Sequence, residues 1–172
     1  KGRKSRKSKH PHSNWFFIMR LSVLGLAALF GAFLATAPAD AAQAGAPGNL
    51  EIVSADGAHH FIVEVAASSQ ARARGLMYRR KMARYAGMLF NYGYEQPVSM
   101  WMKNTFIPLD ILFISKSGRI INVAERTVPH SLRAISSAGS VLAVLEVVAG
   151  TVERLNIKVG DDVRHAIFSP AR

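Results

Sequence analysis

The sequence contains no cysteine. This absence excludes disulfide bonds, a thiol nucleophile, a thiolate metal site and the lipid-bearing cysteine of a bacterial lipoprotein. The G-x-S-x-G nucleophile elbow, the P-loop and the dinucleotide-binding fingerprint are also missing. The four histidines from His59 onward show no H-x-H or H-E-x-x-H spacing. We therefore expect no metal site and no cofactor, and the motifs assign no catalytic residue.

Acidic residues are scarce: 11 Asp and Glu stand against 22 Lys and Arg, for a net charge of +11. Seven of the basic residues lie before Ala42. From Ala42 onward there are 15 basic and 10 acidic residues, an excess near +5. An excess of this size allows an anionic partner, but it does not indicate binding to nucleic acid, and we expect no nucleic-acid partner.

A long uncharged segment from Leu21 to Ala39 follows the basic opening of the chain and ends in small residues. This order is typical of a signal peptide. We predict a signal peptide region over residues 1–41 with cleavage after Ala41, and export to the periplasm or the extracellular space. Residues 1–18 are interpreted as sequence upstream of a natural start at Met19. In the alternative interpretation the leader stays uncleaved and anchors the chain in the inner membrane, its only expected membrane contact.

The remaining sequence has the size of one domain. Residues 42–49 are small and predict a flexible linker, and residues 50–169 predict a single compact domain. Asp56-Gly57 and Ser115–Gly118 indicate the turns of two hairpins. The expected strands are 50–54, 60–66, 87–91, 98–103, 110–114, 120–125, 141–148 and 163–168, and the expected helices are 68–75 and 151–155. This pattern predicts a mainly β fold, a β-sandwich or barrel-like domain with two short helices.

The segment WMKNTFIPLD, Trp101–Asp110, is the most distinctive part of the chain. Trp101, Lys103, Asn104 and Asp110 could stack on a small ligand and form hydrogen bonds with it. In the alternative interpretation Trp101 fills the core, Asn104 holds a turn, and Asp110 caps a helix or pairs with an arginine.

Three further features carry alternatives. Arg74 and Arg79 could clamp an anion, or they could form salt bridges with Asp110 or Glu146. Glu146 in turn stands in an apolar strand and either pairs with such an arginine or lines a pocket. A group of methionines could bind Cu(I) or simply pack in the core, and packing is favoured. These methionines are Met77, Met82, Met88, Met100 and Met102.

Several linked motifs resemble those of the DUF192 family of small prokaryotic proteins. They are Arg74-Gly75-Leu76-Met77-x-Arg79, Gly87–Phe90, WMKNT-x-IPLD, Gly118–Ile120, Pro129-x-Ser131, Leu145–Val147 with Ala149-Gly150, and Val159–Asp161. The resemblance covers residues 50–169 in order. It implies a compact β-rich fold, often behind a signal peptide, with no established reaction and no catalytic residues to transfer. The chain departs from the family pattern at Asn156, where glycine is common, and at Arg84-Tyr85-Ala86, where acidic residues are common.

The leading hypothesis is an exported, non-catalytic binding or accessory domain. Its pocket would be formed by Arg74, Trp101, Lys103, Asn104, Asp110 and Glu146, and would take a small polar or anionic envelope ligand such as a saccharide. One alternative is an enzyme that uses Asp110 or Glu146 for acid–base work on such a ligand. The other is a methionine-based Cu(I)-binding protein. No oligomeric state is predicted.

Overall fold

The computed structural model describes residues 48–168. The predicted signal peptide, the start at Met19 and most of the predicted linker lie outside these residues. Within residues 48–168, neither helix has the length and apolar character needed to cross a membrane.

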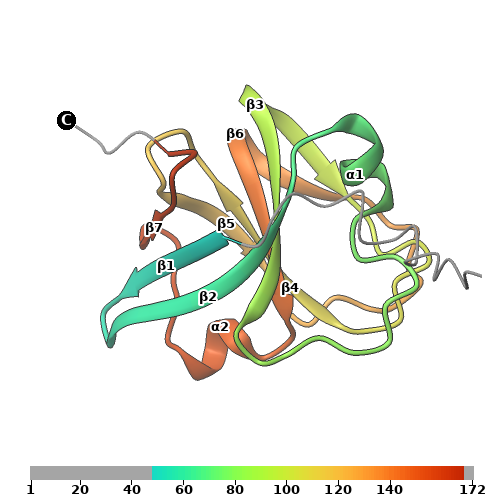
Figure 1. The fold of residues 1–172 in the computed structure, drawn as a ribbon, viewed down its shortest axis with the longest axis horizontal. Coiled ribbons are helices and arrows are strands. Elements are labelled where there is room, and N and C mark those ends of the chain that lie inside the picture. The colour runs from blue at the N-terminus through green and yellow to red at the C-terminus, as the bar shows by residue number, and fades with distance from the viewer. Residues whose placement is uncertain (1–47, 169–172) are drawn as a thin grey trace, which may run out of the picture. The chain divides into compact units, whose positions relative to one another are not determined.

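The described domain is mainly β, with seven strands and two short helices, as the sequence predicted (Figure 1). The strands are β1 (Gly48–Ser54), β2 (Gly57–Ala66), β3 (Ala86–Met100), β4 (Leu109–Ile114), β5 (Ile120–Ala124), β6 (Ile135–Val148) and β7 (Asp162–Arg164). The helices are α1 (Ser69–Arg74) and α2 (Thr151–Arg154). Both predicted hairpins form, since β1 pairs with β2 and β4 pairs with β5 in antiparallel fashion.

All seven strands belong to one curled sheet in the order β5-β4-β6-β3-β2-β1-β7. Only β2 and β3 run parallel to each other. The two edges of the sheet approach at a bridge between Arg119 and Asp162. There the backbone N–H of Val163 donates to the carbonyl of Gly118 at 2.7 Å, and that of Ile120 donates to Asp161 at 3.0 Å. The sheet therefore curls far enough for its edge segments to bond to each other.

Strand β3 is one long strand where the sequence predicted two shorter ones. Its pairing with β6 runs from Gly87 opposite Val147 to Met100 opposite Ile135, with register shifts between Asn91 and Gln96 and again near Ser99. These irregularities let one strand bend, and they explain the interrupted sequence pattern. The predicted strand over 98–103 was wrong at its end, because β3 stops at Met100 and Trp101 to Lys103 lie in a loop. The last strand is also shorter than expected and ends at Arg164.

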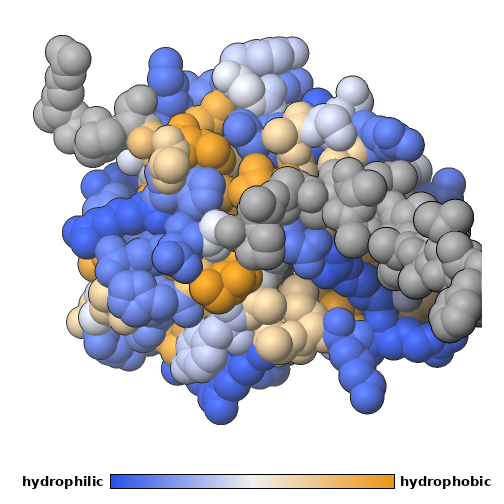
Figure 2. Space-filling model, viewed as in Figure 1, coloured by the Kyte–Doolittle hydropathy of each residue, from blue (hydrophilic) through white to orange (hydrophobic). Residues whose placement is uncertain are grey.

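The curled sheet separates two hydrophobic clusters because neighbouring strand residues point to opposite faces. In β4, Leu109, Ile111 and Phe113 belong to the cluster beneath α1, whereas Leu112 and Ile114 belong to the other cluster. The surface in the view of Figure 2 is mostly hydrophilic, with hydrophobic residues visible in small patches. A polar side chain on a strand therefore lies on one face of the sheet only, and this decides which cluster it borders.

Helix α1 is held close to the sheet at both of its ends. The Ser68 hydroxyl accepts a hydrogen bond from the backbone N–H of Ala71 at 3.0 Å, which caps the helix as predicted. Gly75 ends it with φ +49° and ψ −136°, a conformation that suits glycine. A Cβ atom at this position would lie 3.0 Å from the Phe90 ring. Glycine therefore lets the chain after α1 pass directly over β3.

Loops that are distant in sequence gather beside α1, on the right of Figure 1 and away from the β1–β2 hairpin. Their backbones are joined by hydrogen bonds from Tyr78 to the carbonyl of Asn104 at 2.8 Å and from Met102 to the carbonyl of Ser131 at 3.0 Å. The backbone N–H of His130 donates to Thr105 at 3.2 Å. These bonds fix the loop that follows β3.

The substitution Gly75→Ala is expected to lower the free energy of unfolding by about 1–3 kcal/mol, because it combines a disfavoured backbone conformation with a close contact to Phe90. Urea unfolding followed by tryptophan fluorescence measures the change. Gly139→Ala is the matched control, since a Cβ there meets nothing within 4 Å. Equal stabilities of the two variants would contradict the role assigned to Gly75.

Candidate ligand-binding site

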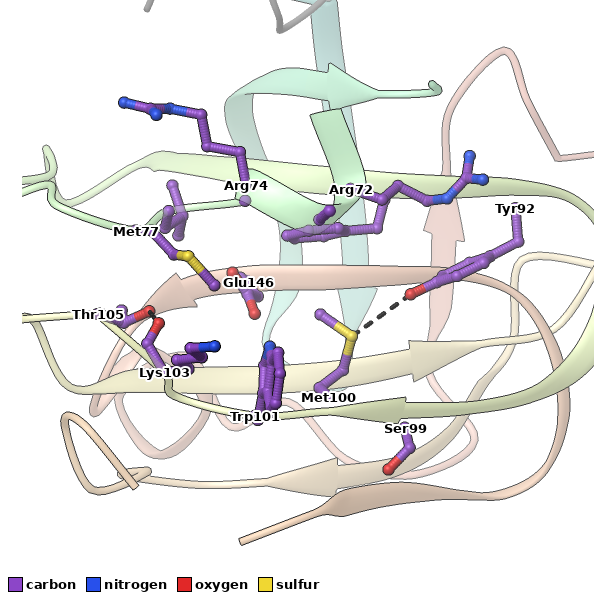
Figure 3. Close-up of a pocket in the computed structure, with 14 residues that line it drawn as sticks. Arg72, Arg74, Met77, Tyr92, Ser99, Met100, Trp101, Lys103, Thr105 and Glu146 are labelled. Carbon is purple, nitrogen blue, oxygen red and sulfur yellow. Dashed lines mark hydrogen bonds between the residues drawn. The ribbon is translucent and has the colours of Figure 1, made fainter. Parts of the chain in front are cut away.

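A pocket of about 300 Å³ opens between α1, β3 and the loop that follows β3, with β6 beneath it (Figure 3). Its lining combines cationic, aromatic, thioether and hydroxyl groups around one carboxyl group. The lining residues are Arg72, Ala73, Arg74, Gly75, Leu76, Met77, Phe90, Tyr92, Ser99, Met100, Trp101, Lys103, Thr105 and Glu146. The volume fits a small molecule.

Glu146 lies at the floor of this pocket. It occupies β6 between Met88 of β3 and Ile111 of β4, and only 4% of its surface is exposed. Its carboxyl oxygens face the pocket in Figure 3. Among residues 48–168, no side chain or backbone group forms a hydrogen bond or an ion pair with this carboxyl group. Glu146 is thus a largely buried residue whose carboxyl oxygens remain accessible from the pocket, since no fully buried side-chain oxygen among the described residues lacks a partner.

Burial raises the pKa of Glu146 from 4.5 to about 8. The cause is the loss of hydration, which penalises the charged form of the carboxyl group. At neutral pH the group is therefore mostly protonated, and it can donate a hydrogen bond as well as accept one. Burial also raises the pKa of Tyr92, an effect that Arg72 opposes and Glu146 assists.

Three cationic side chains stand around the same pocket. The Arg72 guanidinium donates to the backbone carbonyls of Ala67 and Asn91, the latter at 2.9 Å, and also lies over the Tyr92 ring. The Arg74 guanidinium lies 5.6 Å from the centre of the Tyr78 ring. The Lys103 ammonium lies 5.0 Å from the centre of the Trp101 ring. Cations at the rim and a carboxyl group at the floor give the pocket two chemically different ends.

Trp101 and the thioethers supply the apolar walls. Trp101 is 49% exposed, so it is not a core residue, and in Figure 3 its indole nitrogen points toward Glu146. Met100 accepts a hydrogen bond at its sulfur from the Tyr92 hydroxyl at 3.4 Å. Met77 lies on the other side of Glu146 in the same view. An aromatic face and two polarizable thioethers suit the body of an organic ligand.

The structure brings together four of the six residues that the sequence suggested: Arg74, Trp101, Lys103 and Glu146. Asn104 does not line the pocket. It has φ +55°, its side-chain amide donates to the Tyr78 hydroxyl at 2.9 Å, and its carbonyl accepts from the Tyr78 N–H. Asn104 therefore holds the adjoining turn, as in the alternative interpretation of this residue.

Asp110 also lies outside the pocket. It is fully buried and neighbours Ile111 in β4, so it points to the opposite face of the sheet from Glu146. One carboxylate oxygen accepts from the backbone N–H of Arg126 at 2.8 Å, and the other accepts from that of Val152 at 2.9 Å. Asp110 thus joins β4 to α2 and to the turn at Arg126, which has φ +49°.

The structure also bears on the alternatives for Arg79 and for the methionines. Arg79 forms a two-pronged ion pair with Glu64 of β2, and not with Asp110 or Glu146. Met88 and Met102 are buried beneath α1, and Met82 packs against that cluster. Met77 and Met100 line the pocket. Within residues 48–168, no three His, Asp or Glu side chains gather into a cluster that could hold a metal ion.

Sequence reasoning missed Arg72 and Tyr92 as pocket residues. Tyr92 shares a strand face with Phe90, so strand alternation after the Gly87–Phe90 motif could have indicated it. Arg72 carries no such signal, because its position depends on how α1 packs against β3.

The fold and pocket define a class: a small, curled β-sheet domain with a ligand-sized pocket between one helix and a loop. The family profile of DUF192, described as Uncharacterized ACR, matches residues 51–165. The chain belongs to the DUF192 family, as its motifs suggested. Comparison with curated proteins finds no match.

Two solved structures resemble this chain over nearly their whole length. One is a Sinorhizobium meliloti 1021 protein described as a candidate transcription regulator. It is 46% identical with a TM-score of 0.70, and the match covers 72% of this chain and 96% of that one. The other is a protein of unknown function from Novosphingobium aromaticivorans DSM 12444. It is 36% identical with a TM-score of 0.67, and the match covers 73% and 96% of the two chains.

The pKa of Glu146 predicts how stability depends on pH. The folded state keeps the proton between about pH 4.5 and about pH 8, whereas the unfolded chain loses it, so the free energy of unfolding falls as pH rises through this window. The full fall is on the order of 5 kcal/mol. The substitution Glu146→Gln removes the ionisation, so its stability relative to the wild type should rise from about pH 5 to about pH 9.

Urea unfolding at both pH values measures this difference. Glu125→Gln is the matched control, because it makes the same chemical change at an exposed residue outside the pocket. Parallel pH profiles of the wild type and Glu146→Gln would show that Glu146 titrates normally.

Proposed function

We propose that this chain is an exported binding domain that holds a small polar or anionic ligand in the pocket above Glu146. The observation that carries the proposal is a largely buried residue, Glu146, whose carboxyl group opens into the floor of a pocket of about 300 Å³ and is hydrogen-bonded to no described residue. A bound ligand would supply the missing hydrogen bonds. The uncharged segment from Leu21 to Ala39 supports export.

The cationic rim favours a ligand with at least one negative or strongly polar group. Lys103 and Arg74 lie beside aromatic rings, and these contacts favour their positions around the pocket. Trp101 offers a half-exposed face on which a flat or apolar part of the ligand can rest. The same cations disfavour a metal ion, so methionine-based Cu(I) binding is the weaker alternative, which a Cu(I) titration tests.

Ligand-detected NMR of the full chain against small organic acids, phosphate esters and saccharides tests the binding function. At least one class should bind, and Trp101→Ala and Lys103→Ala should each weaken that binding by about tenfold, since each removes one wall or one charge. Tyr94→Ala and Lys158→Ala are matched controls at exposed positions outside the pocket. No binding by any class, or equal effects in pocket and control variants, would refute the proposal.

An enzymatic role is a second candidate, and the raised pKa of Glu146 favours it. A carboxyl group that titrates near neutral pH can give or take a proton during a reaction. Asp110 is unsuited to this work, because backbone N–H groups occupy both of its oxygens. If the chain is an enzyme, a ligand identified by NMR should be converted on prolonged incubation with the wild type but not with Glu146→Gln. Recovery of the unchanged ligand from the wild type would support binding alone.

A further inference from the structure

The pocket has one acidic residue, Glu146, at its floor and three cationic residues elsewhere in its lining. The carboxyl group of Glu146 lies at the floor, where its strand neighbours Met88 and Ile111 are apolar. The cations of Arg72, Arg74 and Lys103 are arranged around the lining above it. In Figure 3 the Lys103 ammonium and the Trp101 indole nitrogen point into the space in front of Glu146.

These cations do not neutralise Glu146. Arg72 is engaged by two backbone carbonyls, and Arg74 and Lys103 lie over aromatic rings. Among the described residues, no ion pair within 4.0 Å joins any of them to the Glu146 carboxyl group. The Glu146 carboxyl group and the Lys103 ammonium thus line one pocket without being paired to each other, and a molecule in the pocket can contact both.

The other elements around Glu146 add no competing partner. On β2, Glu64 lies beyond Met88 in the same row of the sheet and is paired with Arg79. On β3, Tyr92 faces the pocket with its hydroxyl on the sulfur of Met100. On β4, the residues of this face are the apolar Leu109, Ile111 and Phe113. No described group on these strands is hydrogen-bonded to Glu146, so its carboxyl group is open to a donor from a ligand.

We propose that the pocket takes a small zwitterion, whose ammonium group binds Glu146 at the floor and whose anionic group lies between Lys103 and the Trp101 indole N–H. The carbon skeleton of the ligand would contact Met77, Met100 and the Trp101 ring. This inference rests on the proposed binding function and specifies its ligand class.

Charge complementarity selects a zwitterion over simpler ions. A plain anion would contact Lys103 but leave the Glu146 carboxyl group without a partner, and a plain amine would contact Glu146 but be repelled by Lys103. A zwitterion meets a group of opposite character at each end. A pocket of about 300 Å³ has room for a molecule of amino-acid size.

Binding of an ammonium group is then linked to pH. Burial keeps Glu146 protonated at neutral pH, so an ammonium ligand that pairs with the carboxylate displaces a proton. As pH rises toward the pKa of about 8, the affinity for the ammonium ligand should increase by about tenfold for each pH unit. Above that pKa the affinity should level off. An anion that accepts the Glu146 proton would show the reverse trend and weaken above about pH 8.

The experiment is isothermal titration of the full chain with ω-amino carboxylates from glycine to aminohexanoate, with the matched plain carboxylates, and with the matched alkylamines. At about pH 8, at least one amino carboxylate should bind about tenfold or more tightly than its matched carboxylate and its matched amine. Glu146→Gln should abolish this advantage and its pH dependence, whereas Glu125→Gln should keep both. Lys103→Ala should weaken the amino carboxylate and the carboxylate alike, whereas Lys158→Ala should weaken neither.

Three outcomes separate this inference from the proposed function. Equal affinity for the matched carboxylate, unchanged in Glu146→Gln, would overturn the zwitterion and leave an anion-binding pocket. Binding of another small polar class without any amino carboxylate would overturn it as well. The absence of binding by every class would overturn the binding function itself. If Glu146→Gln does not fold, the direction of the wild-type pH trend decides between the zwitterion and the anion.

Discussion

The pairing of β3 with β6 is the constraint on which the rest of the domain depends. These are the longest strands, with 15 and 14 residues, and they lie side by side in the middle of the strand order. Their register places Glu146 opposite Met88 and therefore beneath α1. A slip by one residue would turn Glu146 into the other hydrophobic cluster, which contains Val152 of α2. The position of the acid is thus a property of the sheet as a whole.

The pocket itself is made by what covers the sheet. Helix α1 approaches β3 closely because Gly75 has no side chain, and the loop after β3 is tied to the neighbouring loops by backbone bonds. Three non-glycine residues in these loops, Tyr78, Asn104 and His130, have positive φ angles between 55° and 66°. Such conformations are strained and persist where surrounding contacts impose them. The rim is therefore held in place before any ligand arrives.

The sequence predicted most features that depend on near neighbours. Strand alternation, the hairpin turns, the Ser68 cap and the stop at Gly75 were all evident from local patterns. Arg74, Trp101, Lys103 and Glu146 attracted attention because each interrupts a simple apolar or polar pattern. Asp110 and Glu146 looked alike as carboxylates in apolar strands, and only the long-range pairing of β4 with β6 reveals that they face opposite sides. Arg72 was not predicted as a pocket residue for the same reason, because its position depends on the long-range packing of α1 on β3.

The closure of the sheet near Arg119 and Asp162 affects whether strands of other molecules can pair with the sheet edges. Edge strands with open backbone groups recruit strands from other molecules and so promote fibrils. Here β7 and the segment before β5 satisfy one another, so an incoming strand finds part of each edge already occupied. This arrangement requires glycine at position 118, because a Cβ atom there would lie 2.4 Å from the carbonyl oxygen of Val163. A single glycine thereby allows the two edges of the sheet to meet.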